Sequence, residues 1–212
     1  MSPAFPIGAF AYSHGLEKAA EDGQVAGPDR LATWLADLIR HGSLRNDLVL
    51  LAAAWHATTA GDRAALMQIA DLGLALQPTA ERHLETVTQG NAFLATVKSA
   101  WPMPRLCDLA RGGDTAYPVA VALAAASHAI PLPATLLAYS IAFASNLVSA
   151  AIRLSLIGQT DGQRILAALM PTIREAAAFA EQTTLDDIGS AGFASDLASL
   201  RHETQYTRLF RS

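Results

Sequence analysis

Residues 133–157 read PATLLAYSIAFASNLVSAAIRLSLI, a segment long and apolar enough to be scored as a membrane span. It also contains four serines, Asn146 and Arg153, and no cluster of Lys or Arg flanks it. In lipid, each of these polar groups would need a partner inside the protein. A helix that is apolar on nearly every side is also typical of the centre of a large α-helical domain. We therefore interpret 133–157 as a buried central helix and expect no membrane insertion.

The rest of the chain shows helical periodicity, and no alternating segment bounded by turn residues is long enough to build a sheet. Proline, glycine and capping residues mark where helices begin and end. They predict helices over residues 29–41, 44–59, 62–76, 79–100, 105–110, 117–129, 133–157, 162–170, 171–182 and 193–202. The short connections favour neighbouring antiparallel helices. The sequence thus predicts an all-α, single-domain bundle over residues 1–212, with roughly ten helices around the central apolar one.

The composition describes a chain with little charged surface. Of its 212 residues, 51% are hydrophobic and 16% are charged, against a usual charged share of about 25%. This shortage predicts surfaces that are buried against other proteins. The formal net charge of -4 supplies no basic field for a phosphate backbone, so we expect no nucleic-acid ligand. Cys107 is the single cysteine and no secretory signal is evident, so we expect a reducing, cytoplasmic location.

The motifs of common catalytic and metal sites are missing from the sequence. The six histidines are His14, His41, His56, His83, His128 and His202. No two of them share the i, i+4 spacing that aims two imidazoles at one ion, although ligands from separate helices could still converge. No glycine motif for phosphate binding occurs, and Ser13, His14 and Asp22 form no recognisable nucleophile elbow. We therefore expect no enzyme activity, no metal site and no cofactor.

The two ends of the chain carry the unusual side chains. The N-terminal segment 2–17 reads SPAFPIGAFAYSHGLE, and such an apolar, aromatic start either packs into the fold or binds a partner. The C-terminal tail 200–212 reads LRHETQYTRLFRS and combines arginines with aromatics, the residue types that most often anchor protein interfaces. The tail is therefore a candidate binding element. In the alternative interpretation, Tyr206 and Phe210 pack on the protein's own core.

These stretches resemble a known family. The opening looks like the N-terminal signature of the UreF family of urease accessory proteins, SPxxPIGxFxYSxGLE, and the tail is similar to the closing signature of that family. Between them, ERxxExxxQG at 81–90, YPV at 117–119, and NLVSAAIR at 146–153 followed by GQTDGQ occur in the expected order. The match spans essentially the whole chain. In the family a leucine-rich segment usually precedes the signature, where this sequence has only Met1.

The resemblance implies an all-α, non-enzymatic scaffold that forms a homodimer and joins a second accessory protein, UreD, called UreH in some systems. Together they would recruit the GTPase UreG to the urease apoprotein, so that nickel reaches the active site. By position, the resemblance assigns partner binding to both ends of the chain. The residues so marked are Phe5, Pro6, Gly8, Phe10, Tyr12, Ser13, Gly15 and Glu17 at one end, and Arg201, His202, Glu203, Tyr206, Arg208, Leu209 and Phe210 at the other.

Physical roles for some of these residues follow from their chemistry. Pro6 and Gly8 would fix an irregular turn, which aims Phe10 and Tyr12 outward or into a cleft. Arg208 would contact a carboxylate of UreD/UreH or UreG. Two other functional classes compete with the scaffold: a helical domain that binds a small ligand or a metal, and an integral membrane helix bundle. The missing metal spacing disfavours the first, and the polar residues of 133–157 disfavour the second.

Overall fold

The computed structural model describes residues 5–104 and 112–212, and over these residues the chain is helical without strands. The elements are η1 (Ala9–Ala11), α1 (Leu16–Glu21), α2 (Gly27–Arg40), α3 (Ser43–Ala60), α4 (Arg63–Ala75), α5 (Ala80–Ala100), α7 (Tyr117–Ser127), α8 (Leu132–Arg153), α9 (Gln159–Glu181), η2 (Leu185–Asp187) and α10 (Phe193–His202). The all-α prediction is confirmed for this part of the chain. The predicted helix over 105–110 lies outside the described residues, as do residues 1–4.

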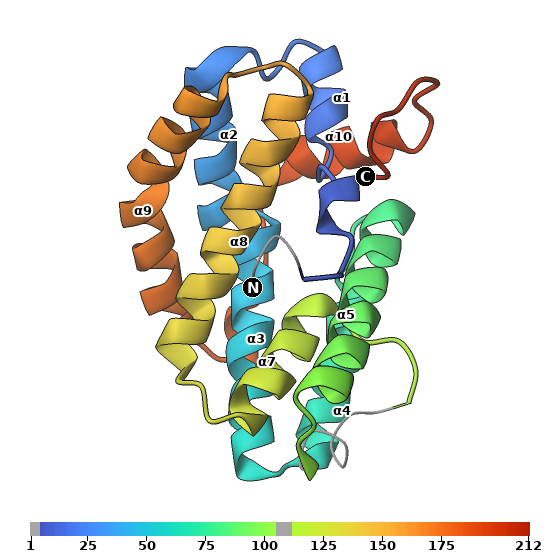
Figure 1. Ribbon diagram of the computed structural model, residues 1–212, viewed down its shortest axis with the longest axis vertical. Helices are drawn as coiled ribbons and strands as arrows, with labels where there is room; N and C mark the ends of the chain where they lie inside the picture. Colours follow the sequence, from blue (N-terminus) through green and yellow to red (C-terminus); the bar gives the residue numbers. More distant parts are fainter. Residues whose placement is uncertain (1–4, 105–111) are drawn as a thin grey trace.

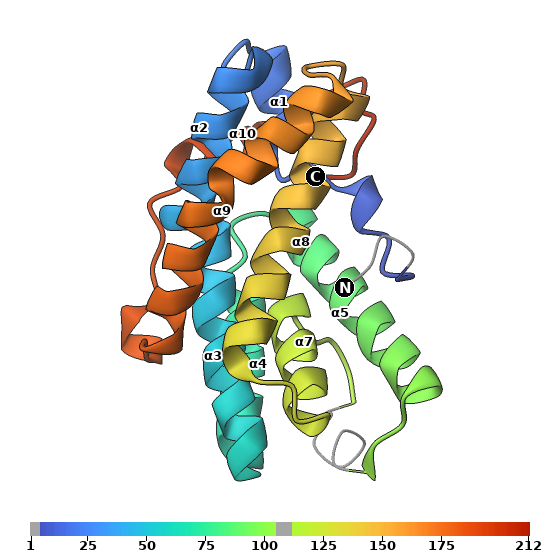
Figure 2. The ribbon, with the colours of Figure 1, turned by 60° about the vertical axis from the view of Figure 1, so that its left-hand side comes forward.

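The centre of the fold is built by α3 and α7. Helix α3 contacts α2, α4, α7, α8 and α9, and α7 is buried at nine of its eleven residues. Figures 1 and 2 show α8 between α9 on one side and the α5 and α7 pair on the other. Helix α8, which covers most of the predicted central helix 133–157, contacts α1, α2, α3, α7 and α9. Its central position stays a prediction.

Helix α8 is the segment that length and composition mark as a candidate membrane span, and it ends at Arg153 rather than at Ile157. Half of its most apolar stretch is buried inside the protein. Its buried side includes Leu136, Leu147 and Ala151. Because the core helix of a soluble protein passes the same length and composition test, this one helix is weak evidence for a membrane location.

Helix α9 runs through Pro171 without a break, so the two predicted helices 162–170 and 171–182 are one. A proline inside a helix removes one backbone hydrogen bond. Here the apolar face continues on both sides of it, with Ile165 and Leu169 before and Ile173 after, all buried. This face packs on α2 and α8. Tertiary packing therefore overrides the local signal of the proline.

Helices α5 and α7 approach each other very closely. A Cβ added at Gly90 of α5 would overlap the carbonyl oxygen of Thr115, just before α7 begins. The Thr86 hydroxyl accepts a bond of 3.0 Å from the backbone N–H of Tyr117, which holds the start of α7 against α5. This contact brings the ERxxExxxQG and YPV stretches of the sequence together.

Candidate functional site

The two ends of the chain lie side by side and are hydrogen-bonded to each other (Figure 1). The backbone N–H of Ser13 donates to the carbonyl oxygen of Ser212 over 2.9 Å, and the Ser13 hydroxyl bonds the same oxygen. The N–H of Arg211 donates to the carbonyl of Ala11 over 2.8 Å. The N-terminal segment and the C-terminal tail, predicted as two binding elements, therefore form one structural unit.

Glu17, in the first turn of α1, hydrogen-bonds the C-terminal tail and His202. Its carboxylate accepts the backbone N–H groups of Leu209 and Phe210 at 2.7 and 2.9 Å, and the Nε2 of His202 lies 3.1 Å from it. The Glu17 side chain is buried. A buried carboxylate needs such donors, since an unpaired one carries a large desolvation cost. Glu17 is therefore an internal anchor that fixes the course of the tail.

A second carboxylate, that of Glu81 at the start of α5, binds His202 and Arg208. It lies 2.7 Å from Nδ1 of His202 and accepts from Nη1 of Arg208 at 2.6 Å. His202 is fully buried between Glu17 and Glu81. Both ring nitrogens of His202 are therefore engaged, one with each carboxylate. The result is a chain of hydrogen bonds that links α1, α10 and α5.

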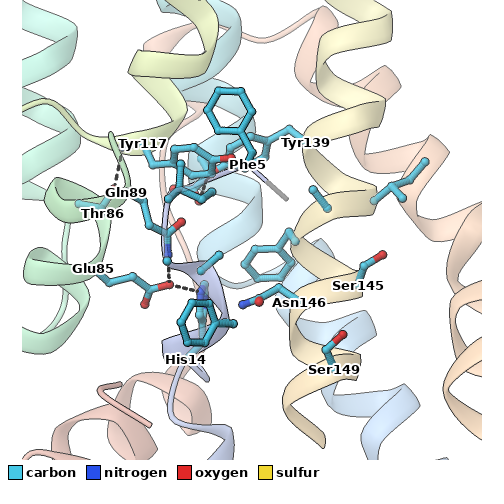
Figure 3. A pocket seen from close by; sticks show the side chains of 18 of the residues that line it. Phe5, His14, Glu85, Thr86, Gln89, Tyr117, Tyr139, Ser145, Asn146 and Ser149 are labelled. Atoms are coloured by element: carbon cyan, nitrogen blue, oxygen red, sulfur yellow. Dashed lines mark hydrogen bonds and ion pairs between the residues drawn. The ribbon is translucent and has the colours of Figure 1, made fainter. Parts of the chain in front are cut away.

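Glu85, one turn further along α5, joins the same network to His14 (Figure 3). It is bonded by His14 Nε2 at 2.8 Å, by Gln89 and Ser212 at 2.9 Å, and by the guanidinium of Arg82. Burial alone would raise the pKa of Glu85, but the Arg82 charge and the bonds from His14 and Ser212 outweigh it and hold the pKa at about 2. Glu85 is therefore ionised at every physiological pH.

Gly15 lets α1 lie against α10. Its φ is +74°, and an added Cβ would sit 2.7 Å from the backbone nitrogen of Ser199. Any larger residue would strain the backbone and push the two helices apart. A glycine is thus required at this position of the signature for the ends to meet. Gly8 has a similar φ of +71° but open space around it, so only the backbone conformation favours glycine there.

The structure divides the sequence-predicted site residues into three sets. The buried set is Tyr12, Ser13, Gly15, Glu17, His202 and Phe210; the half-buried set is Phe5, Gly8 and Glu203; the exposed set is Pro6, Phe10, Arg201, Tyr206, Arg208 and Leu209. Phe10, Leu209 and Tyr206 are 69%, 62% and fully exposed, respectively. The exposed set faces solvent, although Arg201 and Arg208 are paired with Asp22 and Glu81 of the same chain. The buried set packs inside the protein.

The alternative interpretation, in which the tail aromatics pack on the protein's own core, holds for Phe210 and not for Tyr206. Phe210 packs into the core, with the guanidinium of Arg153 over its ring at 4.4 Å, whereas Tyr206 points entirely into solvent. Phe10 likewise points outward, and Tyr12 points inward. Arg208 binds Glu81 of its own chain, so a partner carboxylate would have to share or replace this contact. Its binding to a partner stays a prediction.

Sequence reasoning missed the residues that hold the ends together. Glu81 and Glu85 lie one helical turn apart on α5, and their signal was the ERxxE stretch that matches the family pattern. His14 appeared only as one of six scattered histidines and beside Ser13 and Asp22 in a rejected catalytic arrangement. In the part of the chain that the structure describes, no three His, Cys, Asp or Glu side chains are arranged to hold a metal ion.

Comparison with known proteins agrees with these features. The model of the UreF family matches residues 25–170. A urease accessory protein UreF of Rhodopseudomonas palustris strain BisB5 is 53% identical over 214 residues, covering 100% of this chain and 88% of that protein. The corresponding values for the UreF proteins of Azorhizobium caulinodans and Xanthobacter autotrophicus are 52% and 51% identity, with 100% of this chain and 92% and 88% of theirs covered. The chain therefore belongs to the UreF family of urease accessory proteins.

Proposed function

We propose that the chain is a non-enzymatic scaffold that binds UreD/UreH and, with it, recruits UreG to the urease apoprotein for nickel insertion. The partner surface is the joined terminal surface, by which we mean Phe10, Tyr206, Arg208 and Leu209 together with the backbone between them. One observation carries the proposal. The two ends are bonded to each other by internal anchors and yet leave large apolar side chains in solvent.

The energetics of the joined terminal surface support binding rather than folding. Buried groups such as Glu17 and Phe210 already fix the tail, so the exposed Tyr206 and Leu209 contribute nothing to the core. Tyrosine and arginine are the residue types that most often dominate binding energy when a partner covers them. A surface held in place before binding also loses less conformational entropy on association.

We also propose that the protein is cytoplasmic and forms a homodimer. The support for a cytoplasmic location is the single cysteine. The support for a homodimer is the low charged share, 16%, and an exposed apolar pair, Phe193 and Leu197, one turn apart on α10. Contiguous exposed apolar side chains of this kind are typical of protein interfaces.

Co-purification tests the proposal. The double variant Tyr206→Ala/Leu209→Ala removes two exposed side chains without touching an internal bond. We expect it to weaken binding to UreD/UreH by about 30-fold, which corresponds to about 2 kcal/mol, and to reduce urease activation. Met67→Ala, at a similarly exposed apolar position on α4, is the matched control. Normal assembly by the double variant would remove the joined terminal surface from the proposed site.

A further inference from the structure

A pocket of about 820 Å³ lies between the N-terminal segment, α5 and α8 (Figure 3). This volume falls in the range of about 300–1,000 Å³ that is usual for sites that enclose a ligand group. The exposed Pro6 and Phe10 line it from the N-terminal segment, and Phe10 also belongs to the joined terminal surface. The pocket is therefore continuous with the surface proposed to meet a partner.

Separate stretches of the family pattern meet around this pocket. The N-terminal signature supplies Phe5 and His14, the ERxxExxxQG stretch supplies Glu85 and Gln89, and Tyr117 and Asn146 come from the two later stretches (Figure 3). These stretches are far apart in the sequence. Tyr117 and Asn146 take no part in the bonds that join the two ends, so those bonds do not account for their position at this cavity.

Asp47 of α3 places a carboxyl group in the pocket wall. One of its oxygens accepts the hydroxyl of Tyr139 at 2.9 Å, and within residues 5–104 and 112–212 it forms no ion pair. Burial raises the pKa of Asp47 to about 6, against the weaker opposing effect of the Arg82 charge. At neutral pH the group is therefore mostly an ionised carboxylate that lacks a directly bound cation.

His14 adds an unsatisfied acceptor to the lining. Its Nε2 binds Glu85, whereas its Nδ1 is buried and has no hydrogen-bond partner among the described residues. Burial lowers the pKa of His14, so the ring is neutral and Nδ1 carries a lone pair. His14 also has a φ of +56°, which is unusual for a residue other than glycine. Unpaired buried acceptors of this kind are rare in native proteins.

Aromatic rings complete the pocket. Tyr117 and Tyr139 lie with ring centroids 5.4 Å apart near Asp47, and Phe5 and Phe143 line the walls. The faces of aromatic rings attract cations. The positive groups of the lining are already engaged, since Arg82 is paired with Glu85 and Arg153 lies over Phe210. The charge without a bound counterpart is that of Asp47.

We propose that this pocket receives a basic side chain, Lys or Arg, from a partner polypeptide, with its cationic group bound by Asp47 and flanked by Tyr117 and Tyr139. The inference rests on the proposed function, because it gives the chemistry of the group that a partner inserts beside the joined terminal surface. Both a carboxylate and aromatic faces favour such a group, and an apolar lining suits its aliphatic stem.

The first test uses a probe of the cationic group alone. The full chain is titrated with n-butylguanidinium and with n-butylurea, which has a similar shape and no charge, while NMR follows the ring signals of the tyrosines. We expect saturable shifts at Tyr117 and Tyr139 with n-butylguanidinium, binding at least tenfold weaker for n-butylurea, and a similar loss in Asp47→Asn. Equal binding of the two probes, or no binding of either, would overturn the inference.

The second test uses the whole partner. We expect Asp47→Asn to weaken the complex with UreD/UreH and UreG by about 30-fold, as for a central anchor. Asp37→Asn, the same change at an exposed position of α2, is the matched control and keeps full binding. If Asp47→Asn assembles normally while Tyr206→Ala/Leu209→Ala does not, the pocket inference is wrong and the proposed function stands. If neither variant weakens assembly, both are wrong.

Discussion

Asp47→Asn is predicted to stabilise the free chain at neutral and alkaline pH. The pKa of the Asp47 carboxyl is about 6 in the fold, against 3.8 for an ordinary aspartate. The folded state therefore favours the protonated form. Its stabilising effect is complete below about pH 4 and is lost as the pH rises through 6. Above pH 6, folding keeps an ionised carboxylate in a buried wall with only the Tyr139 hydroxyl bound to it.

The magnitude follows from that difference of about 2 in pKa, which corresponds to about 3 kcal/mol. Asparagine has nearly the same shape, keeps an acceptor for Tyr139 and is never charged. Urea unfolding of the parent chain and of Asp47→Asn at pH 8 and at pH 4 measures the effect. We expect the variant to be more stable by about 3 kcal/mol at pH 8 and nearly equal at pH 4.

Asp37→Asn changes an exposed carboxylate and should leave the unfolding free energy within about 0.5 kcal/mol at both pH values. A variant Asp47→Asn that is no more stable than the parent at pH 8 would show that the carboxylate is adequately compensated in the free chain. A gain in stability that accompanies a loss of partner binding is the expected mark of a functional residue.

Three further predictions concern the anchors of the two ends. Glu17→Gln should expose the two tail amides that Glu17 binds. If the anchoring free energy falls by about 2 kcal/mol, hydrogen exchange at these amides becomes faster by one to two orders of magnitude, whereas Glu21→Gln on the surface of the same helix should leave it unchanged. Unchanged exchange in Glu17→Gln would contradict the anchor role. Gly8→Ala should lower the unfolding free energy by roughly 1 kcal/mol through backbone strain. Gly15→Ala should lower it by well over that amount, because of these two glycines only Gly15 abuts α10. Equal losses of unfolding free energy in urea would refute that reason. The pKa of Glu85 is about 2 in the fold, against 4.5 for an ordinary glutamate. Its contribution of about 3 kcal/mol to the unfolding free energy is therefore present above pH 4.5 and lost as the pH falls towards 2. Glu85→Gln should flatten the fall in stability between pH 5 and pH 3, and a pH profile parallel to that of the parent chain would argue against this contribution.

Local signals in the sequence were sufficient for most of the fold. Thr79 caps α5 through the N–H of Arg82, and the Trp101-Pro102 break ends the same helix, as predicted. The errors came where tertiary packing decided the outcome. Pro171 stays inside α9 because the apolar face continues across it. The single-domain description of residues 1–212 stays a prediction.

The sequence marked residues at both ends of the chain but not how those residues are arranged. Residue type and family pattern marked Glu17, His202 and Phe210 for the partner, yet the structure turns all three inward. The reason is pairing across the length of the chain: Glu17 meets Phe210, and Asp47 meets Tyr139 on another helix. Side-chain direction at such sites depends on contacts between distant segments, which no local pattern encodes.

Hydrogen exchange of the full chain with and without UreD/UreH shows whether the two ends bind a partner as one surface. We expect UreD/UreH to slow exchange in residues 8–12 and 203–211 together, because both belong to the joined terminal surface, and to leave α4 unaffected. Protection of α4 with unchanged exchange at both ends, or protection of one end alone, would contradict this expectation.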